Sequence, residues 1–131
     1  MTGSIRYFTD KELAAVDTGI VKLAIGFGAR IDNLRMAWGS PLVVNSCCRT
    51  AEHNKAIGGH PRSLHVYDFP YHPTGGTCAI DFHLFHTEEL NEKFKKIAYH
   101  MGFSVGDESG CIHIDDRTHM LGMPQKRFTW K

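Results

Sequence analysis

Apolar residues recur at helical intervals in two stretches of the chain. From Phe27 to Trp38 they stand three or four positions apart, which predicts an amphipathic helix that ends at Gly39. The same spacing from Leu90 to Met101 predicts a second helix. We expect the apolar stripe of each helix to face the core, because burying that stripe is what stabilises such a helix.

Short runs of β-branched and aromatic residues, each bounded by turn-forming residues, predict the strands. These runs lie at 5–8, 41–46, 77–82, 103–105 and 111–115, and two short helices are predicted at 11–16 and 50–57. The polar turn 106–110 between the last two strands predicts a hairpin. Because helices and strands do not alternate regularly, we predict an α+β fold with a small antiparallel sheet flanked by helices.

The predicted strand 111–115 has two chemically different faces. Successive side chains of a strand point to opposite sides, so Cys111, His113 and Asp115 share one face. Ile112 and Ile114 lie on the other face and are expected in the core. One side of this strand is therefore polar and rich in possible metal ligands.

Size and composition are those of one globular domain. The chain has 131 residues, of which 42% are hydrophobic and 22% charged, and its formal net charge is +1, so we predict a single domain over 1–131. The near-neutral charge gives no electrostatic drive toward nucleic acid, and no apolar run is long enough to cross a membrane. The N-terminus lacks the pattern of a signal peptide, so synthesis in the cytoplasm is expected.

Histidine is unusually frequent, and three segments place metal-type ligands in or beside predicted strands. His65 and Asp81 are 16 positions apart, and Asp81 and His113 are 32 apart, so only a sheet could bring them together. Two imidazoles and one carboxylate suit Zn²⁺ and leave a position for water, as in catalytic sites. His83 shares a strand face with Asp81 and is a reserve ligand. Spacing alone leaves open that these are ordinary hydrogen-bonded histidines.

The cysteines do not form a zinc-thiolate motif. The chain has four of them and no C-x-x-C pair. We expect four buried, reduced thiols, with a disulfide as the alternative.

Several dispersed motifs together resemble one family of enzymes. They are SCCRTAEHN (46–54), GG (58–59), SLH (63–65), GTCAID (76–81) and IHID (112–115), in this order. In this combination the chain resembles the D-Ala-D-Ala carboxypeptidase-type zinc peptidases. That family includes peptidoglycan carboxypeptidases, phage endolysins and vancomycin-resistance dipeptidases, and shares its fold with the hedgehog signalling domain. The resemblance implies this fold for the chain.

The resemblance also implies roles for individual residues. His65, Asp81 and His113 fall on the zinc ligands of the family. Arg49 falls on the arginine that contacts the substrate, with Ser46 beside it. An arginine suits this role because its planar cation can hold a carboxylate or polarise a peptide oxygen, although a surface salt bridge is the alternative for Arg49.

Two features depart from the family pattern. The gap between the first histidine and the aspartate is longer here, so 66–75 is interpreted as an insertion. As a lid it would bring Tyr71 and His72 to the substrate, and a plain surface loop is the alternative. The general base of the family is an acid just before the last histidine, and the nearest candidates here are Glu108 and then Asp107.

The implied function is that of a monomeric zinc metallopeptidase acting on bacterial peptidoglycan. The enzyme would cleave a D-Ala-D-Ala bond as a carboxypeptidase or an L-Ala-D-Glu bond as an endopeptidase. The protein would reach the cell wall after its release from the cytoplasm, in the manner of a phage lysin. The substrate is then the stem or cross-link peptide, without nucleic acid or membrane partners. Two alternatives remain: a zinc-stabilised binding module of the same fold without turnover, and a structural protein without metal.

Overall fold

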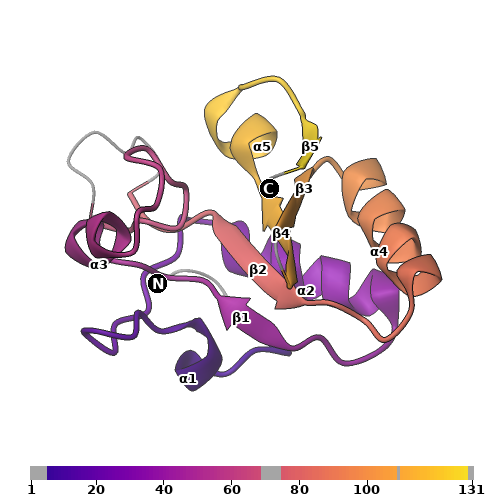
Figure 1. Cartoon of the computed structure of the whole chain (residues 1–131), viewed down its shortest axis with the longest axis horizontal. Helices are drawn as coiled ribbons and strands as arrows, with labels where there is room; N and C mark the ends of the chain where they lie inside the picture. Colours follow the sequence, from indigo (N-terminus) through magenta and orange to yellow (C-terminus); the bar gives the residue numbers. More distant parts are fainter. Residues whose placement is uncertain (1–5, 69–74, 109, 130–131) are drawn as a thin grey trace.

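A computed structural model describes residues 6–68, 75–108 and 110–129 of the chain, which fold around a five-stranded sheet (Figure 1). The helices are α1 (Asp10–Leu13), α2 (Phe27–Trp38), α3 (Ala51–Ala56), α4 (Glu88–His100) and α5 (Arg117–Leu121). The strands are β1 (Val44–Ser46), β2 (Ala79–His83), β3 (Ser104–Glu108), β4 (Cys111–Asp115) and β5 (Arg127–Thr129). Within this described part, no helix has the length and apolar character needed to cross a membrane.

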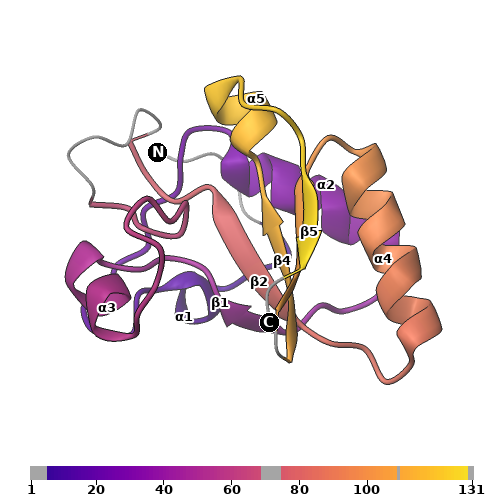
Figure 2. The same cartoon turned by 45° about the horizontal axis from the view of Figure 1, so that its top comes forward.

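The strand order is β1-β2-β4-β3-β5. The α+β class predicted from the sequence is confirmed, but the sheet is mixed rather than wholly antiparallel, because β5 pairs with β3 in the parallel direction. After β4 the chain passes through α5 and returns on the outer side of β3, so β5 runs the same way as its neighbour (Figure 2). The sequence prediction contained no strand at 127–129.

The central strands β2 and β4 pair in a register that separates core from site. Asp81 stands opposite His113 in this antiparallel pair, and Phe82 stands opposite Ile112. Phe82 and Ile112 are completely buried, like Ile80 before them, and belong to the core. Because neighbouring residues of a strand point to opposite faces, Asp81 and His113 lie together on the face turned away from this core.

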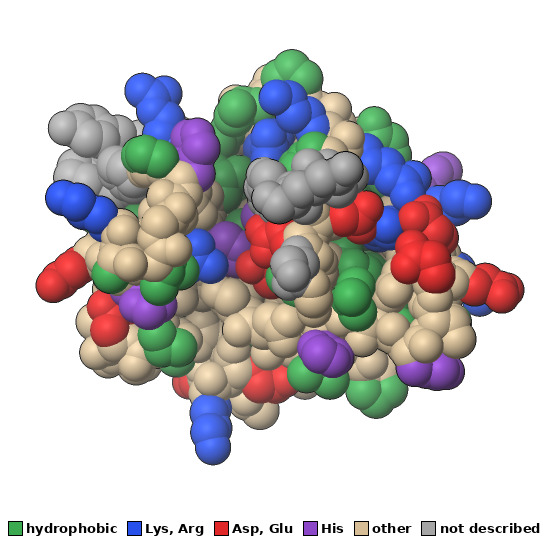
Figure 3. Space-filling model, viewed as in Figure 1, with side chains coloured by type: hydrophobic (Ala, Val, Ile, Leu, Met, Phe, Trp, Pro, Cys, Tyr) green, Lys and Arg blue, Asp and Glu red, His purple; other side chains and the backbone are tan. Residues whose placement is uncertain are grey.

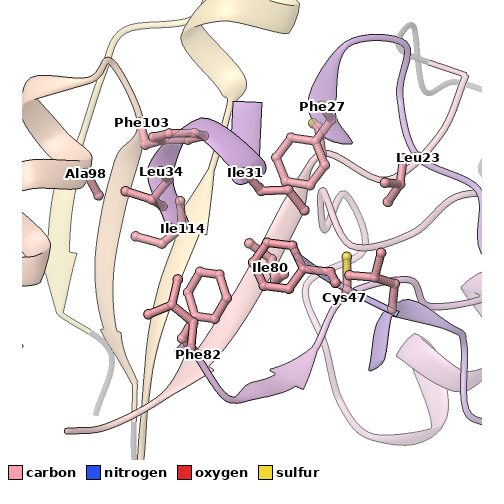
Figure 4. Close-up of a cluster of buried hydrophobic side chains, with 14 of the residues drawn as sticks. Leu23, Phe27, Ile31, Leu34, Cys47, Ile80, Phe82, Ala98, Phe103 and Ile114 are labelled. Atoms are coloured by element: carbon pink, nitrogen blue, oxygen red, sulfur yellow. The ribbon is translucent and has the colours of Figure 1, made fainter. Parts of the chain in front are cut away.

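The core lies between the sheet and two helices. Helix α2 passes behind the sheet with α4 beside it (Figure 1). Phe27, Ile31 and Leu34 of α2 lie close to Ile80 and Ile114 of the sheet, as Figure 4 shows. All five side chains are fully buried, and removing their apolar surface from water stabilises the sheet. Ile80 and Ile114 are the chain neighbours of Asp81 and His113, so the stabilised part of the sheet is the part that carries these two polar residues.

Two local predictions need correction. Of the predicted strand 5–8, residues 6–8 are described and form no strand. The backbone N–H groups of Arg6 and Tyr7 instead donate to the carboxylate of Asp32 on α2, which satisfies them without a sheet partner. The predicted turn 106–110 is shorter, because β3 continues to Glu108 and carries three of its residues.

A bulge in β1 places Ser46 next to the polar face. Val44 pairs with Phe82 and Ser46 pairs with Asp81, so Asn45 is an extra residue on the β1 side. Bulges re-aim side chains and end regular pairing. The chain leaves the sheet here and continues into the segment that carries Arg49.

Gly106 is required by the packing of the C-terminal strand. It pairs with His113 on one side and with Phe128 on the other. A Cβ atom at this position would lie 2.5 Å from the Phe128 ring, which therefore occupies the space above the glycine. The ring is 5.8 Å from the ring of His113, so β5 forms a side wall of the polar face.

Replacing this glycine is expected to displace β5. Gly106→Ala forces the Phe128 ring aside, and overpacking of this kind costs about 1–3 kcal/mol of unfolding free energy. Urea unfolding measures the loss. In the Phe128→Ala background the same Gly106→Ala change should cost much less, because the colliding ring is gone. An equal cost in both backgrounds would show that the strand does not depend on this contact.

Candidate metal centre

The three predicted ligands meet on the polar face of the sheet. The side chains of His65, Asp81 and His113 each offer a donor atom, and these atoms lie within 4.8 Å of one another. All three residues are at most 5% exposed. The sequence prediction that a sheet brings these distant residues together holds for Asp81 and His113, whereas His65 reaches them from a segment outside the five strands. Figure 3 shows basic, histidine and acidic side chains side by side in a hollow near the middle of this face.

His65 turns its Nε2 atom toward the centre. Its Nδ1 lies 2.8 Å from the carbonyl oxygen of Cys47, which can only accept, so Nδ1 carries the proton in this contact. The other ring nitrogen, Nε2, lies 3.2 Å from Asp81 Oδ2 and makes no hydrogen bond within the described residues. A buried polar atom without a hydrogen bond is costly, and a metal ion at Nε2 would satisfy it.

The main chain holds His65 in place from two sides. Its carbonyl oxygen accepts from the backbone N–H of Arg49 at 3.0 Å and from Thr77 Oγ1 at 2.7 Å. The N–H of Tyr67 in turn donates to the carbonyl oxygen of Arg49, and this pairing forms a short parallel bridge. Individual hydrogen bonds therefore position His65 although its segment belongs to none of the five strands.

His113 is oriented by an acidic and a basic neighbour. Its Nε2 donates to Asp115 Oδ2 at 2.8 Å. Arg117 holds that carboxylate through Nε and Nη2, at 2.9 and 2.7 Å. The other ring nitrogen, Nδ1, lies 2.8 Å from Asp81 Oδ1. A carboxylate behind a ligating histidine fixes the ring and raises its basicity, and this arrangement matches that pattern.

The electrostatics of the centre favour a positive charge between the donors. Burial opposes a charged imidazole, but hydrogen bonds to Asp115 and Asp81 outweigh it and raise the pKa of His113 to about 9. Burial would also raise the pKa of Asp81, yet the two histidines lower it well below its usual range. Without a metal the positive charge is a proton on His113. A divalent cation would take its place.

The donor chemistry fits zinc. Two imidazoles and one carboxylate are a ligand set of catalytic Zn²⁺ sites, which keep a further position for water or substrate. The buried Nε2 of His65, which makes no hydrogen bond within the described residues, supports the fit from the structure itself. His83, the reserve ligand, is exposed at the end of β2 and is not part of the three-residue group.

Arg49 and Ser46 lie beside the centre and line an adjoining cleft. Arg49 donates from Nη2 to Ser46 Oγ at 3.1 Å, and Ser46 is the strand partner of Asp81. The same cleft is lined by Lys11 and Glu12 of α1, by Val16, and by the residues of β1. The guanidinium is thus held at the rim, where it can present its remaining N–H groups to a ligand.

Asn54 supports Arg49, a role that sequence reasoning did not assign. Its Oδ1 accepts from Arg49 Nη1 at 3.0 Å, and its Nδ2 donates to the carbonyl oxygen of His60 at 2.8 Å. The amide is 3% exposed, and a Cβ at Gly59 would lie 2.1 Å from Oδ1. Asn54 occurs in the motif with Arg49, so the spacing within that motif was the available signal.

The two candidate acids lie on opposite sides of β3. Asp107 Oδ1 accepts from Lys95 Nζ of α4 at 2.7 Å, on the side of the helices. Glu108 Oε1 lies 3.9 Å from His113 Nδ1. The structure therefore brings Glu108 to the three candidate ligands and leaves Asp107 away from them.

The other predicted site residues have different outcomes. Tyr71 and His72 lie outside the described residues. The four cysteines are free and buried, as the sequence predicts. Cys111 is the cysteine nearest to Glu108, and its Sγ lies 3.0 Å from Glu108 Oε2.

Comparison with known proteins gives one family match. The family model of peptidase M15 matches residues 7–115, most of the chain, including the three donors, Arg49 and Glu108. Helix α5 and strand β5 lie beyond the matched residues. No curated protein matches the chain.

The metal-free protein is expected to lose stability as the pH rises from about 6.5 to 9. Because folding raises the pKa of His113 to about 9, the folded chain binds this proton more tightly than the unfolded chain. The resulting stabilisation is fully present below pH 6.5 and is lost as the pH passes 9. Urea unfolding of metal-free wild type and His113→Gln should show a difference that shrinks over this range. A constant difference would contradict the assignment.

Asp115→Asn is expected to weaken Zn²⁺ binding about 10- to 100-fold, because the carboxylate that orients His113 is lost. Competition with a chromophoric chelator measures the affinity. Asp116→Asn is the matched control, since Asp116 is equally buried but pairs with Arg30 instead. It should reduce stability and leave zinc affinity unchanged. Equal losses of affinity in both variants would mean that the effect is a general loss of folding.

Proposed function

The chain belongs to the peptidase M15 family, and from this we propose that it is a zinc peptidase acting on peptide bonds of bacterial peptidoglycan. The observation that carries the proposal is the buried group of His65, Asp81 and His113, into which His65 turns an Nε2 atom that makes no hydrogen bond within the described residues. We further propose that it cleaves a D-Ala-D-Ala bond as a carboxypeptidase or an L-Ala-D-Glu bond as an endopeptidase. In the latter case its role would be like that of a phage lysin.

In this proposal His65 Nε2, a carboxylate oxygen of Asp81 and His113 Nδ1 hold the zinc ion. When bound, zinc polarises the scissile carbonyl and lowers the pKa of a water molecule. The protein keeps each imidazole in the required tautomer through Cys47 and Asp115. The ligands therefore need little rearrangement to bind the ion.

Glu108 is proposed as the general base. Its Oε1 lies 3.9 Å from His113 Nδ1, and this position beside the candidate ligands suits a carboxylate that would take a proton from a metal-bound water. Oε1 would take a proton from the attacking water and give it to the amine that leaves. Asp107 cannot serve in this position, because Lys95 holds it on the other side of β3.

Arg49 is proposed to orient the peptide. Its guanidinium is permanently charged and can donate two parallel hydrogen bonds to a carboxylate or one to a peptide oxygen. Asn54 and Ser46 hold it at the rim of the cleft, next to the strand partner of Asp81. A guanidinium fixed in this way loses little conformational entropy when the substrate binds.

Mass analysis of digested peptidoglycan tests the proposal, because the product masses identify the bond. The zinc-loaded protein should release peptides, a chelator should abolish release, and added Zn²⁺ should restore it. Binding of peptidoglycan fragments with no new products would support a zinc-stabilised binding module of the same fold instead. Absence of stoichiometric zinc in the purified protein would contradict both functions.

Glu108→Gln is expected to retain one zinc ion and to reduce turnover roughly a hundredfold to ten-thousandfold, because the amide cannot take the proton. Asp107→Asn is the matched control on the neighbouring residue. It breaks the ion pair with Lys95 and should cost stability while turnover per folded molecule is kept. Turnover per folded molecule and zinc content, measured for both variants, show which of the two acids the reaction needs. A larger loss of turnover in Asp107→Asn would overturn the role of Glu108.

A further inference from the structure

Cys111 is the cross-strand neighbour of Glu108. The two residues pair directly in the β3–β4 ladder. Cys111 Sγ donates to Glu108 Oε2 at 3.0 Å. The cysteine is 7% exposed, so water has little access to its side chain. Nothing in the proposed reaction requires a thiol at this position.

The contact distinguishes the two oxygens of the Glu108 carboxylate. Oε2 is occupied by the thiol, whereas Oε1 is the oxygen that lies 3.9 Å from His113 Nδ1. A glutamate side chain has three rotatable bonds, and this one is 28% exposed, so without a partner it could turn toward solvent. The thiol therefore selects the orientation in which Oε1 faces the metal ligands.

The chemistry of the donor also matters. An S–H group is neutral and a weak donor, so it orients a carboxylate while leaving most of its proton affinity. The neighbouring Asp107 shows the contrast, because the ammonium of Lys95 holds it with a charge-assisted bond. A carboxylate that acts as a base needs a neutral partner such as the thiol, because a cation would stabilise its negative charge and oppose protonation.

We propose that Cys111 is a positioning residue, which holds Glu108 through Oε2 so that Oε1 is the oxygen that exchanges the proton. The proposal rests on the function proposed above and adds to it the residue that holds the general base, Glu108, in position. Because the donor atoms of Asp81, Glu108 and Cys111 also lie within 4.8 Å of one another, the competing role for the thiol is that of a metal ligand.

Kinetics of zinc-loaded variants test the positioning role. Cys111→Ala should lower kcat by about tenfold to a hundredfold at unchanged KM and zinc content, since small displacements of a reacting group cost this much. Cys111→Ser keeps a donor and should recover most of kcat. Cys78→Ala, which removes another buried thiol, should leave kcat unchanged. Equal activity of wild type and Cys111→Ala, or no recovery in Cys111→Ser, would overturn the proposal.

A spectroscopic measurement tests the contact without turnover. The S–H stretching band of Cys111 is identified by its loss in Cys111→Ser, and it should move to higher frequency in Glu108→Ala, where the acceptor is gone. An unmoved band would overturn the proposal. A thiolate-to-metal charge-transfer band in the Co²⁺-loaded protein would overturn it in favour of a metal ligand. If no peptide is hydrolysed but the band moves, the contact holds and the proposed function fails.

Discussion

The register between β2 and β4 determines both the core and the metal centre. Asp81 stands opposite His113 in the antiparallel register of β2 and β4. In the same register Ile80 stands opposite Ile114, and both side chains point into the core. A slip by one residue would exchange the two faces and place carboxylate and imidazole groups among apolar side chains. The cost of burying those polar groups and exposing the isoleucines therefore holds the ligands in position.

The centre is built around one carboxylate between two imidazoles. Each imidazole has its outer nitrogen fixed by an acceptor, the carbonyl oxygen of Cys47 for His65 and the carboxylate of Asp115 for His113. The inner nitrogens must then face Asp81, where two acceptors without a proton or a metal would repel each other. The hydrogen bonds outside the centre thereby create the demand for positive charge inside it.

The sequence could predict most elements, because these depend on local patterns, and its dispersed motifs named the three residues that the structure brings together. Helical spacing identified α2 and α4, and alternation identified the polar face of β4. Strand β5 could not be predicted, since its three residues pair only because the chain returns to β3. Which of Glu108 and Asp107 lies beside the three candidate ligands also required the structure. The predicted turn 106–110 hid the fact that both acids are in a strand, on opposite faces.

The three ligands are not anchored equally. Asp81 and His113 lie on central strands with partners on both sides, whereas His65 lies on an irregular segment attached by individual hydrogen bonds. A metal ion bound to all three would therefore act as a cross-link between the segment before β2 and the sheet. Local opening of the native state begins where such attachments are few. Such an ion would stabilise the segment around His65 more than it stabilises the sheet, which is already paired on both sides of each ligand-bearing strand.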